Sequence, residues 1–303
     1  MTAELKPRRT LTPARAALMA MMLALSAGIL GWLVYRERDV FMHYNWHLRW
    51  ELILASFVLF SVGLGLVAIV WGWIATSVGV RGTFVMHIRY YCIANIAKRL
   101  PGTVWYVAGR TLLYEREGLE PAQIVIGSGI ELALMVMSSI VASLVFATPT
   151  IVQWGLSRWS LGIAFVVGCI MVQPRFVGWV LRRFKVETQF TFRYVDIVKW
   201  FLTYLVVCII GGLVLYIIGN SFTIIRTSDI PYVIGCWSLT GLVSSTVFFL
   251  PSNLGVTEVT LSLLLSRIMP SSVAVVIAVF VRILLFLYEL IWAVILFRAK
   301  SPA

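Results

Sequence analysis

The chain has 303 residues, of which 60% are hydrophobic and only 13% are charged. A soluble domain of this length needs far more polar surface to cover its core, so the composition excludes an ordinary water-soluble fold. The net charge of +12 does not indicate a nucleic-acid-binding protein, because most basic residues flank apolar segments, where they meet lipid headgroups. The composition predicts an integral membrane protein, with a single membrane domain over 1–303.

Several apolar runs are long enough to cross a bilayer, which takes about 20 helical residues at 1.5 Å per residue. They predict an all-α polytopic membrane protein with about six transmembrane helices. In chain order, the expected spans are Ala16–Tyr35, Leu52–Ala75, Ala122–Ala147, Trp159–Leu181, Ile197–Gly219 and Val273–Phe297.

Two further apolar stretches, 85–114 and 230–268, are each interrupted near the middle. The first contains Pro101-Gly102 and the second contains Pro251-Ser-Asn-Leu-Gly255. Proline removes a backbone donor and glycine favours turns, so a continuous helix is not expected at either place. Each stretch is therefore predicted to form a re-entrant hairpin of two half-length helices, with its irregular backbone shielded by protein or a wet cavity.

The distribution of Lys and Arg predicts the orientation of these segments. With the N-terminus inside, 17 basic residues fall on the cytoplasmic side. The opposite side receives six: Arg36, Arg38, Arg49, Arg158, Arg226 and Arg267. This asymmetry is typical of a cytoplasmic face, so both termini are expected in the cytoplasm and the protein in the cytoplasmic (inner) membrane.

The two interrupted stretches resemble each other. Leu100-Pro101 matches Leu250-Pro251 at an offset of 150 residues, and three predicted spans separate the stretches, so they should enter from opposite faces. This pattern predicts an inverted repeat, with a first half over 1–147, a second half over 159–297 and a ligand site between them. Charges occupy comparable places in the two halves, since Arg110 falls near Glu258 and Glu131 falls opposite Arg282.

Charged groups inside predicted spans are expensive, at about 2.5–3.5 kcal/mol near a helix centre on insertion scales. The clearest cases are Glu131, Arg282 and Glu289. Glu131 lies deep enough in its span for us to expect contact with Arg282. Such a pair could hold two helices together, or it could form a polar binding site for a headgroup or a proton. The sequence leaves both alternatives open. His87 and Asn95 are expected to make interhelical hydrogen bonds.

The two breaks also predict helix starts near mid-membrane, where unpaired N–H groups favour an anion. Thr103, Ser252 and Asn253 are candidate N-caps. Lys98, Arg99 and Arg110 surround the first break, which suggests a site for an anionic headgroup. The alternative is that these bases only anchor the hairpin at the membrane interface.

No cofactor or metal is expected. The sequence contains no nucleotide-binding loop, no nucleophile–base pair and no metal-ligand spacing. Its four cysteines occur singly in apolar segments and are interpreted as packing residues: Cys92, Cys169, Cys208 and Cys236.

Two motifs around the breaks resemble the signatures of the lysylphosphatidylglycerol synthase transmembrane (flippase-like) family. The first runs from Asn95 through Lys98-Arg-Leu-Pro101-Gly102 to Arg110 and Glu131. The second is Pro251-Ser-Asn-Leu-Gly255-Val-Thr-Glu258, followed by Arg282. Asn253-Leu254 stand where family members often have Gly-Gly, and Thr257 stands where they often have Arg, which makes the second site less basic. The resemblance implies lipid translocation, and no synthase domain fits within this chain.

The leading hypothesis is a flippase-like carrier for an anionic amphiphile, with a polyprenyl-phosphate-linked sugar favoured over a phospholipid. The alternatives are a membrane transferase using Glu131 or Glu258 as base, and a non-catalytic scaffold in cell-envelope glycan synthesis. Expected partners are membrane lipids and the lipid-phosphate substrate, with a second copy of the chain or a glycosyltransferase left open. The candidate binding residues are Lys98, Arg99, Thr103, Arg110, Glu131, Asn253, Glu258 and Arg282.

Overall fold

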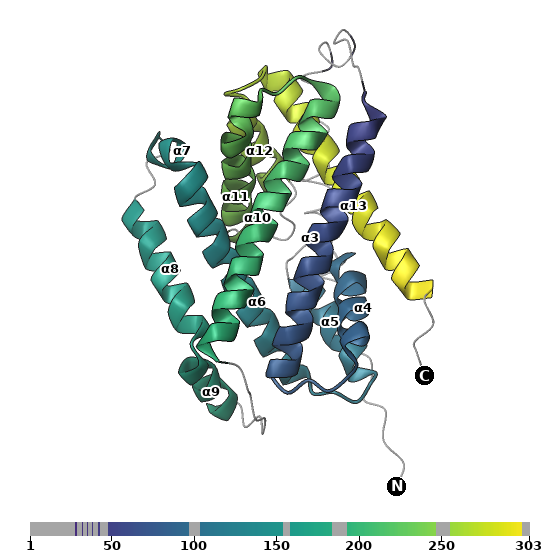
Figure 1. Ribbon diagram of the computed structural model, residues 1–303, viewed down its shortest axis with the longest axis vertical. Coiled ribbons are helices and arrows are strands. Elements are labelled where there is room, and N and C mark those ends of the chain that lie inside the picture. Colours follow the sequence, from purple (N-terminus) through teal and green to yellow (C-terminus); the bar gives the residue numbers. More distant parts are fainter. Residues whose placement is uncertain are drawn as a thin grey trace.

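The computed structural model describes residues 48–96, 104–153, 158–183, 193–246 and 255–298, together with Gly28, Trp32, Tyr35, Arg38 and Met42. All regular structure within these residues is helical (Figure 1). The α-helices are α3 (Trp50–Ser77), α4 (Phe84–Asn95), α5 (Val104–Glu115), α6 (Pro121–Phe146), α7 (Thr148–Gln153), α8 (Arg158–Val172), α9 (Pro174–Arg183), α10 (Tyr194–Phe222), α11 (Ile230–Thr246), α12 (Val256–Leu265) and α13 (Ser271–Arg298). A 3-10 turn, η2 (Thr227–Asp229), precedes α11.

Four of the described helices, α3, α6, α10 and α13, are long and apolar enough to cross a membrane. They contain 26 to 29 residues each, and at 1.5 Å per residue even the shortest exceeds the roughly 30 Å hydrocarbon layer. They confirm the helices expected around Leu52–Ala75, Ala122–Ala147, Ile197–Gly219 and Val273–Phe297. Apolar side chains such as Val58, Leu202 and Ile295 are about half exposed on these helices, as lipid contact requires. The chain is thus an all-α protein with the features of an integral membrane protein.

The order of long and short helices occurs twice. In the first set, long α3 is followed by short α4 and α5 and then by long α6; in the second, α10 is followed by α11, α12 and α13 in the same order. Within each set, consecutive helices pack against each other. From here on, first half and second half mean these two sets. Helices α7, α8 and α9 connect them, although the sequence prediction assigned the segment of α8 and α9 to the second half, and α8 packs on α6.

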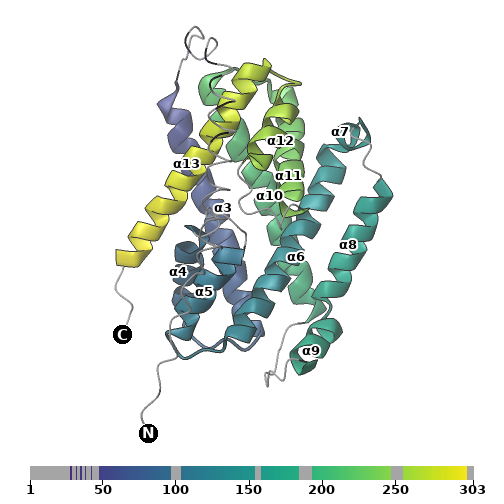
Figure 2. The same cartoon turned by 180° about the vertical axis from the view of Figure 1, so that it is seen from behind.

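The two leading long helices, α3 and α10, lie side by side and run in opposite directions (Figures 1 and 2). At one end, the N–H of Arg49, just before α3, donates to the carbonyl of Ser221, near the end of α10, at 3.2 Å. At the other end, Thr76 of α3 and Lys199 of α10 line the same pocket. The leading helices of the two halves are therefore antiparallel.

Each half also contacts the other through one short helix and one long helix. Helix α4 of the first half packs on α13 of the second, and α11 of the second half packs on α6 of the first. The guanidinium of Arg89 donates to the carbonyl of Phe297 at 3.1 Å, at the end of α13. In the equivalent place, Gly235 lies directly against the backbone of Phe146, at the end of α6. Each half therefore places one short helix against the last long helix of the other half.

The predicted breaks in 85–114 and 230–268 fall at residues outside the described ranges, except for Gly255 at the end of the second. The described residues on either side form separate helices, with α4 packed on α5 and α11 packed on α12. The pair α4 and α5 lies toward one end of the molecule, and the pair α11 and α12 lies toward the other (Figures 1 and 2). Two short helix pairs are thus carried at opposite ends of the four long helices.

One predicted span is wrong as a single helix. The segment Trp159–Leu181 is divided into α8 and α9 at Gln173. Pro174 begins α9, because proline lacks the N–H that a continuing helix needs but fits the first turn of a new one. The 15 residues of α8 reach only about 22 Å, which is short of the hydrocarbon thickness. The expected span Ala16–Tyr35 lies almost wholly outside the described residues.

Candidate functional site

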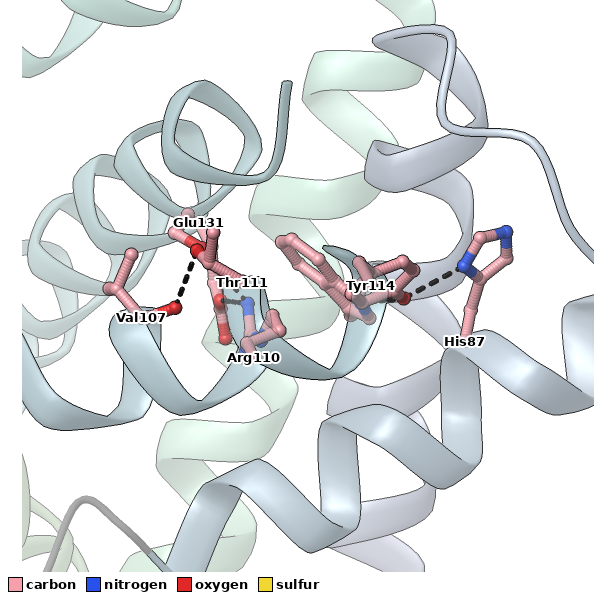
Figure 3. A network of polar contacts seen from close by, with 8 residues as sticks. His87, Val107, Arg110, Thr111, Tyr114 and Glu131 are labelled. Carbon is pink, nitrogen blue, oxygen red and sulfur yellow. Dashed lines mark hydrogen bonds and ion pairs between the residues drawn. The ribbon is translucent and has the colours of Figure 1, made fainter. Parts of the chain in front are cut away.

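A fully buried ion pair joins the two helices that end the first half. The guanidinium Nη1 of Arg110, on α5, lies 2.6 Å from Oε2 of Glu131, on α6, and neither side chain is exposed (Figure 3). The same nitrogen lies 3.3 Å from the hydroxyl of Ser128, one turn earlier on α6. Between the two helices, Gly118 has a φ of +75°, which suits glycine and closes the turn that brings them together.

Aromatic rings surround the Arg110 guanidinium. Its central carbon lies 3.7 Å from the ring centroid of Trp71, 4.8 Å from that of Tyr91 and 5.3 Å from that of Tyr106. Such contacts stabilise a desolvated cation by about 2 kcal/mol or more. The cage is itself held in place, because the indole N–H of Trp71 donates to the hydroxyl of Tyr114 at 3.0 Å. Arg110 is therefore enclosed by its ion-pair partner and by aromatic side chains.

A second ion pair occupies the equivalent place in the other half, with the signs reversed. Glu258 on α12 pairs with Arg282 on α13. The Glu258 carboxylate also accepts a hydrogen bond of 2.7 Å from the N–H of Gly255, the N-cap of α12. Gly255 has a φ of +90°, a conformation that disfavours any residue with a Cβ. This pair is less enclosed, since the Arg282 side chain is 19% exposed.

The predicted approach of Glu131 to Arg282 is wrong. Each is paired within its own half, Glu131 with Arg110 and Arg282 with Glu258. Helix α13 packs against α12, α4, α10 and α3, so Arg282 is carried on a helix whose main neighbours do not include α6. Each of these buried charges is thus neutralised by a partner on an adjacent helix of the same half, and not by a charge in the other half.

The remaining predicted site residues are divided between the described and undescribed ranges. Lys98, Arg99, Thr103 and Asn253 lie outside the described residues. The N-cap of α12 is Gly255, with the capping oxygen supplied by Glu258. Arg110 does not project toward a headgroup in this structure, because it is buried against Glu131.

The two predicted interhelical hydrogen bonds are confirmed. His87 Nδ1 lies 2.8 Å from the hydroxyl of Tyr114, which joins α4 to α5 (Figure 3). The amide of Asn95, on α4, donates to Oε1 of Glu289, on α13, at 3.1 Å. Asn95 and Glu289 are both buried, and their bond joins the two halves. Glu289 was expected as a buried charge but was not included in the predicted site.

Two adjoining cavities lie between the halves. One, of about 300 Å³, is formed mainly by α6, α10 and α11, and the other, of about 200 Å³, by α3, α4, α10 and α13. Asn95 and Glu289 line the smaller one. The two cavities share four wall residues, namely Val67, Met135, Val207 and Trp237. A largely apolar space with a few polar groups therefore extends between the halves, and sequence patterns gave no sign of the hydroxyl-bearing residues that line it.

Comparison of the chain with protein-family models gives no match, and comparison with curated proteins gives none either. Within the described residues, no group of three or more His, Cys, Asp or Glu side chains is placed to hold a metal ion.

Proposed function

We propose that this protein is a carrier that moves an anionic amphiphilic lipid between the two leaflets of the membrane, with a polyprenyl-phosphate-linked sugar favoured over a phospholipid. The observation that supports this most directly is the pair of adjoining cavities built by helices of both halves. Their walls are largely apolar, with a few polar groups, which suits a molecule that has both kinds of surface. The resemblance of the two motifs to flippase-like proteins points in the same direction.

In this proposal, the two halves form an inverted repeat. The antiparallel packing of α3 on α10 and the reciprocal contacts of α4 with α13 and α6 with α11 support it. The short helix pairs would be re-entrant hairpins that enter from opposite faces, and the segments around Ala16–Tyr35 and α8–α9 would bring the number of membrane-crossing segments to six. Ligand sites at the interface of such repeats are common in transporters.

The two ion pairs would hold the halves in different states. The Arg110–Glu131 pair is closed to solvent, whereas the Arg282 side chain is 19% exposed. In alternating access, two similar halves differ in conformation at any one moment, and the different exposure of their ion pairs is consistent with this. Lys98, Arg99, Thr103 and Asn253 would contact the anionic headgroup, and Arg110 would position the hairpin helix α5 against α6.

A bulky side chain in the shared wall is expected to block transport. Val207 lines both cavities, so Val207→Trp should fill part of the space between the halves and reduce lipid movement at least tenfold. The measurement is reconstitution into liposomes that carry either a fluorescent phospholipid or a polyprenyl-phosphate sugar, followed by headgroup accessibility at the outer leaflet, with and without a proton gradient.

The adjacent residue provides a matched control. Val206 is 46% exposed on the outer surface of the same helix, so Val206→Trp adds the same side chain toward lipid and should leave transport near the wild-type rate. If neither lipid crosses faster with wild-type protein than in protein-free vesicles, the carrier proposal fails. A scaffold or transferase role would then replace it.

The proposed orientation has its own test. With both termini in the cytoplasm, single cysteines introduced as Lys6→Cys and Lys300→Cys in a cysteine-free background should react with a membrane-impermeant maleimide only after the cells are opened. Labelling of one position in intact cells and not of the other would contradict an even number of crossings.

A further inference from the structure

Many of the residues that line the larger cavity carry a hydroxyl group. Seven of its described lining residues carry a side-chain hydroxyl, and none of its described lining residues is charged. They come from α6, α10, α11 and α12, and most belong to one helix, α11. These residues are Ser139, Tyr204, Ser238, Thr240, Ser244, Ser245 and Thr257.

These hydroxyls differ in the hydrogen-bonding capacity that remains for a ligand. Ser238 and Ser245 donate to carbonyls one turn back in α11, at 2.9 and 2.8 Å, so their oxygens keep acceptor capacity. Tyr204 and Thr240 are each only 2% exposed, and their hydroxyls have no hydrogen-bond partner among the described residues. Residues that line the cavity therefore carry both donors and acceptors that the described part of the protein leaves unused.

Unused hydroxyls in such a place are costly. An unpaired buried hydroxyl destabilises a protein, and surrounding hydrocarbon offers no substitute partner. Both of the unpaired hydroxyls, those of Tyr204 and Thr240, belong to residues that line one cavity, which favours a polar molecule that completes the site. Its chemistry follows from the wall, because neutral donors and acceptors without a cation suit a neutral hydroxylated group better than a phosphate.

An aromatic residue, Trp237, also lines the cavity. Its indole lies so close to α10 that a Cβ on Gly211 would fall 2.0 Å from the indole nitrogen. Glycine at 211 thus makes room for the ring. A sugar ring has an apolar face that packs against an indole and a rim of hydroxyls that bond to polar side chains, whereas a glycerol group has no such face. At about 300 Å³, the cavity falls at the small end of the range for ligand sites.

We propose that this cavity binds the sugar headgroup of a glycosylated lipid, with Tyr204, Thr240 and the serines of α11 bonding to its hydroxyls and Trp237 packing on its face. That the sugar belongs to a transported lipid rests on the proposed function; recognition of the sugar itself does not.

The test uses the full chain in phosphatidylcholine nanodiscs, which avoids sugar-based detergents. The probe is an alkyl glucoside with a diazirine beside the sugar and an alkyne for detection, and its match is an alkyl glycerol ether with the same diazirine. The glucoside is expected to label α11 saturably, with competition by unlabelled alkyl glucoside. Thr240→Val, which removes one hydroxyl without changing the shape, should weaken binding about 3- to 10-fold.

Ser262→Ala serves as the control, since Ser262 donates to the carbonyl of Val259 and does not line the cavity. It should leave labelling unchanged. Labelling that does not saturate, labelling by the glycerol probe at equal affinity, or indifference to Thr240→Val would overturn the sugar site. Glucoside binding without any lipid transport would support the sugar site and refute the carrier proposal. Lipid transport without glucoside binding would refute the sugar site and support the carrier proposal.

Discussion

Replacing Arg110 with alanine is expected to lower the free energy of unfolding by about 3–5 kcal/mol, because it leaves Glu131 charged, fully buried and without its cation. The loss of the aromatic contacts around the guanidinium adds to this cost. Stability would be measured on purified protein by unfolding in mixed micelles of increasing SDS content, followed by circular dichroism.

The double variant Arg110→Met with Glu131→Leu provides the contrast. It removes both charges and keeps apolar volume, so it should recover much of the lost stability. Arg282→Ala should cost less than Arg110→Ala, since Arg282 is partly exposed and Glu258 keeps its 2.7 Å bond to the N–H of Gly255. If the double variant is as unstable as Arg110→Ala, the two charges do not stabilise the protein by neutralising each other. Loss of transport in Arg110→Ala alone would not identify a headgroup contact.

Gly235→Ala is expected to disrupt the contact between the halves and to destabilise the protein by about 1–3 kcal/mol. A Cβ at this position would lie 2.8 Å from the carbonyl carbon and oxygen of Phe146 and 2.9 Å from the Cβ of Ala147. These atoms belong to the backbone or to a side chain without rotamers, so α11 must move away from α6 to make room. Close helix approach in membranes depends on small residues for this reason.

Gly129→Ala, on α6 itself, is the matched control. Nothing lies within 4 Å of a Cβ built there, and alanine favours a helix over glycine by about 1 kcal/mol. This variant should be as stable as the wild type or more stable in the same SDS titration. Equal destabilisation by Gly129→Ala and Gly235→Ala would show that helix propensity or lipid exposure, and not the α6–α11 contact, determines the effect.

Hydropathy predicted the four long described helices well, because a run of about 20 apolar residues rarely forms anything but a membrane-spanning helix. Proline and glycine predicted interruptions in both halves, but the break at Pro174 inside Trp159–Leu181 was missed, since the surrounding run stays apolar. Hydropathy is averaged over a window of residues, so it does not respond to the single missing backbone N–H of a proline, which ends one helix and begins the next.

The partners of the buried charges were harder to predict. Periodicity places Arg282 and Glu289 on one face of a helix, but it does not say which helix lies opposite. Glu131 and Arg282 were matched because both are deep and opposite in sign. The better signal was that Arg110 and Glu258 occupy comparable places with opposite signs, as do Glu131 and Arg282, which suggests one neutral pair per half.

The local pairing of charges bears on how such a chain enters the membrane. The partners in the two ion pairs are 21 and 24 residues apart, whereas Asn95 and Glu289 are 194 residues apart. During synthesis, Arg110 and Glu131 can therefore neutralise each other as soon as α6 has emerged, before any of the second half exists. A lone charge in lipid is expensive and would tend to hold its helix out of the bilayer. Each half can thus insert without an unpaired arginine, and the bond from Asn95 to Glu289 forms only when the last helix arrives.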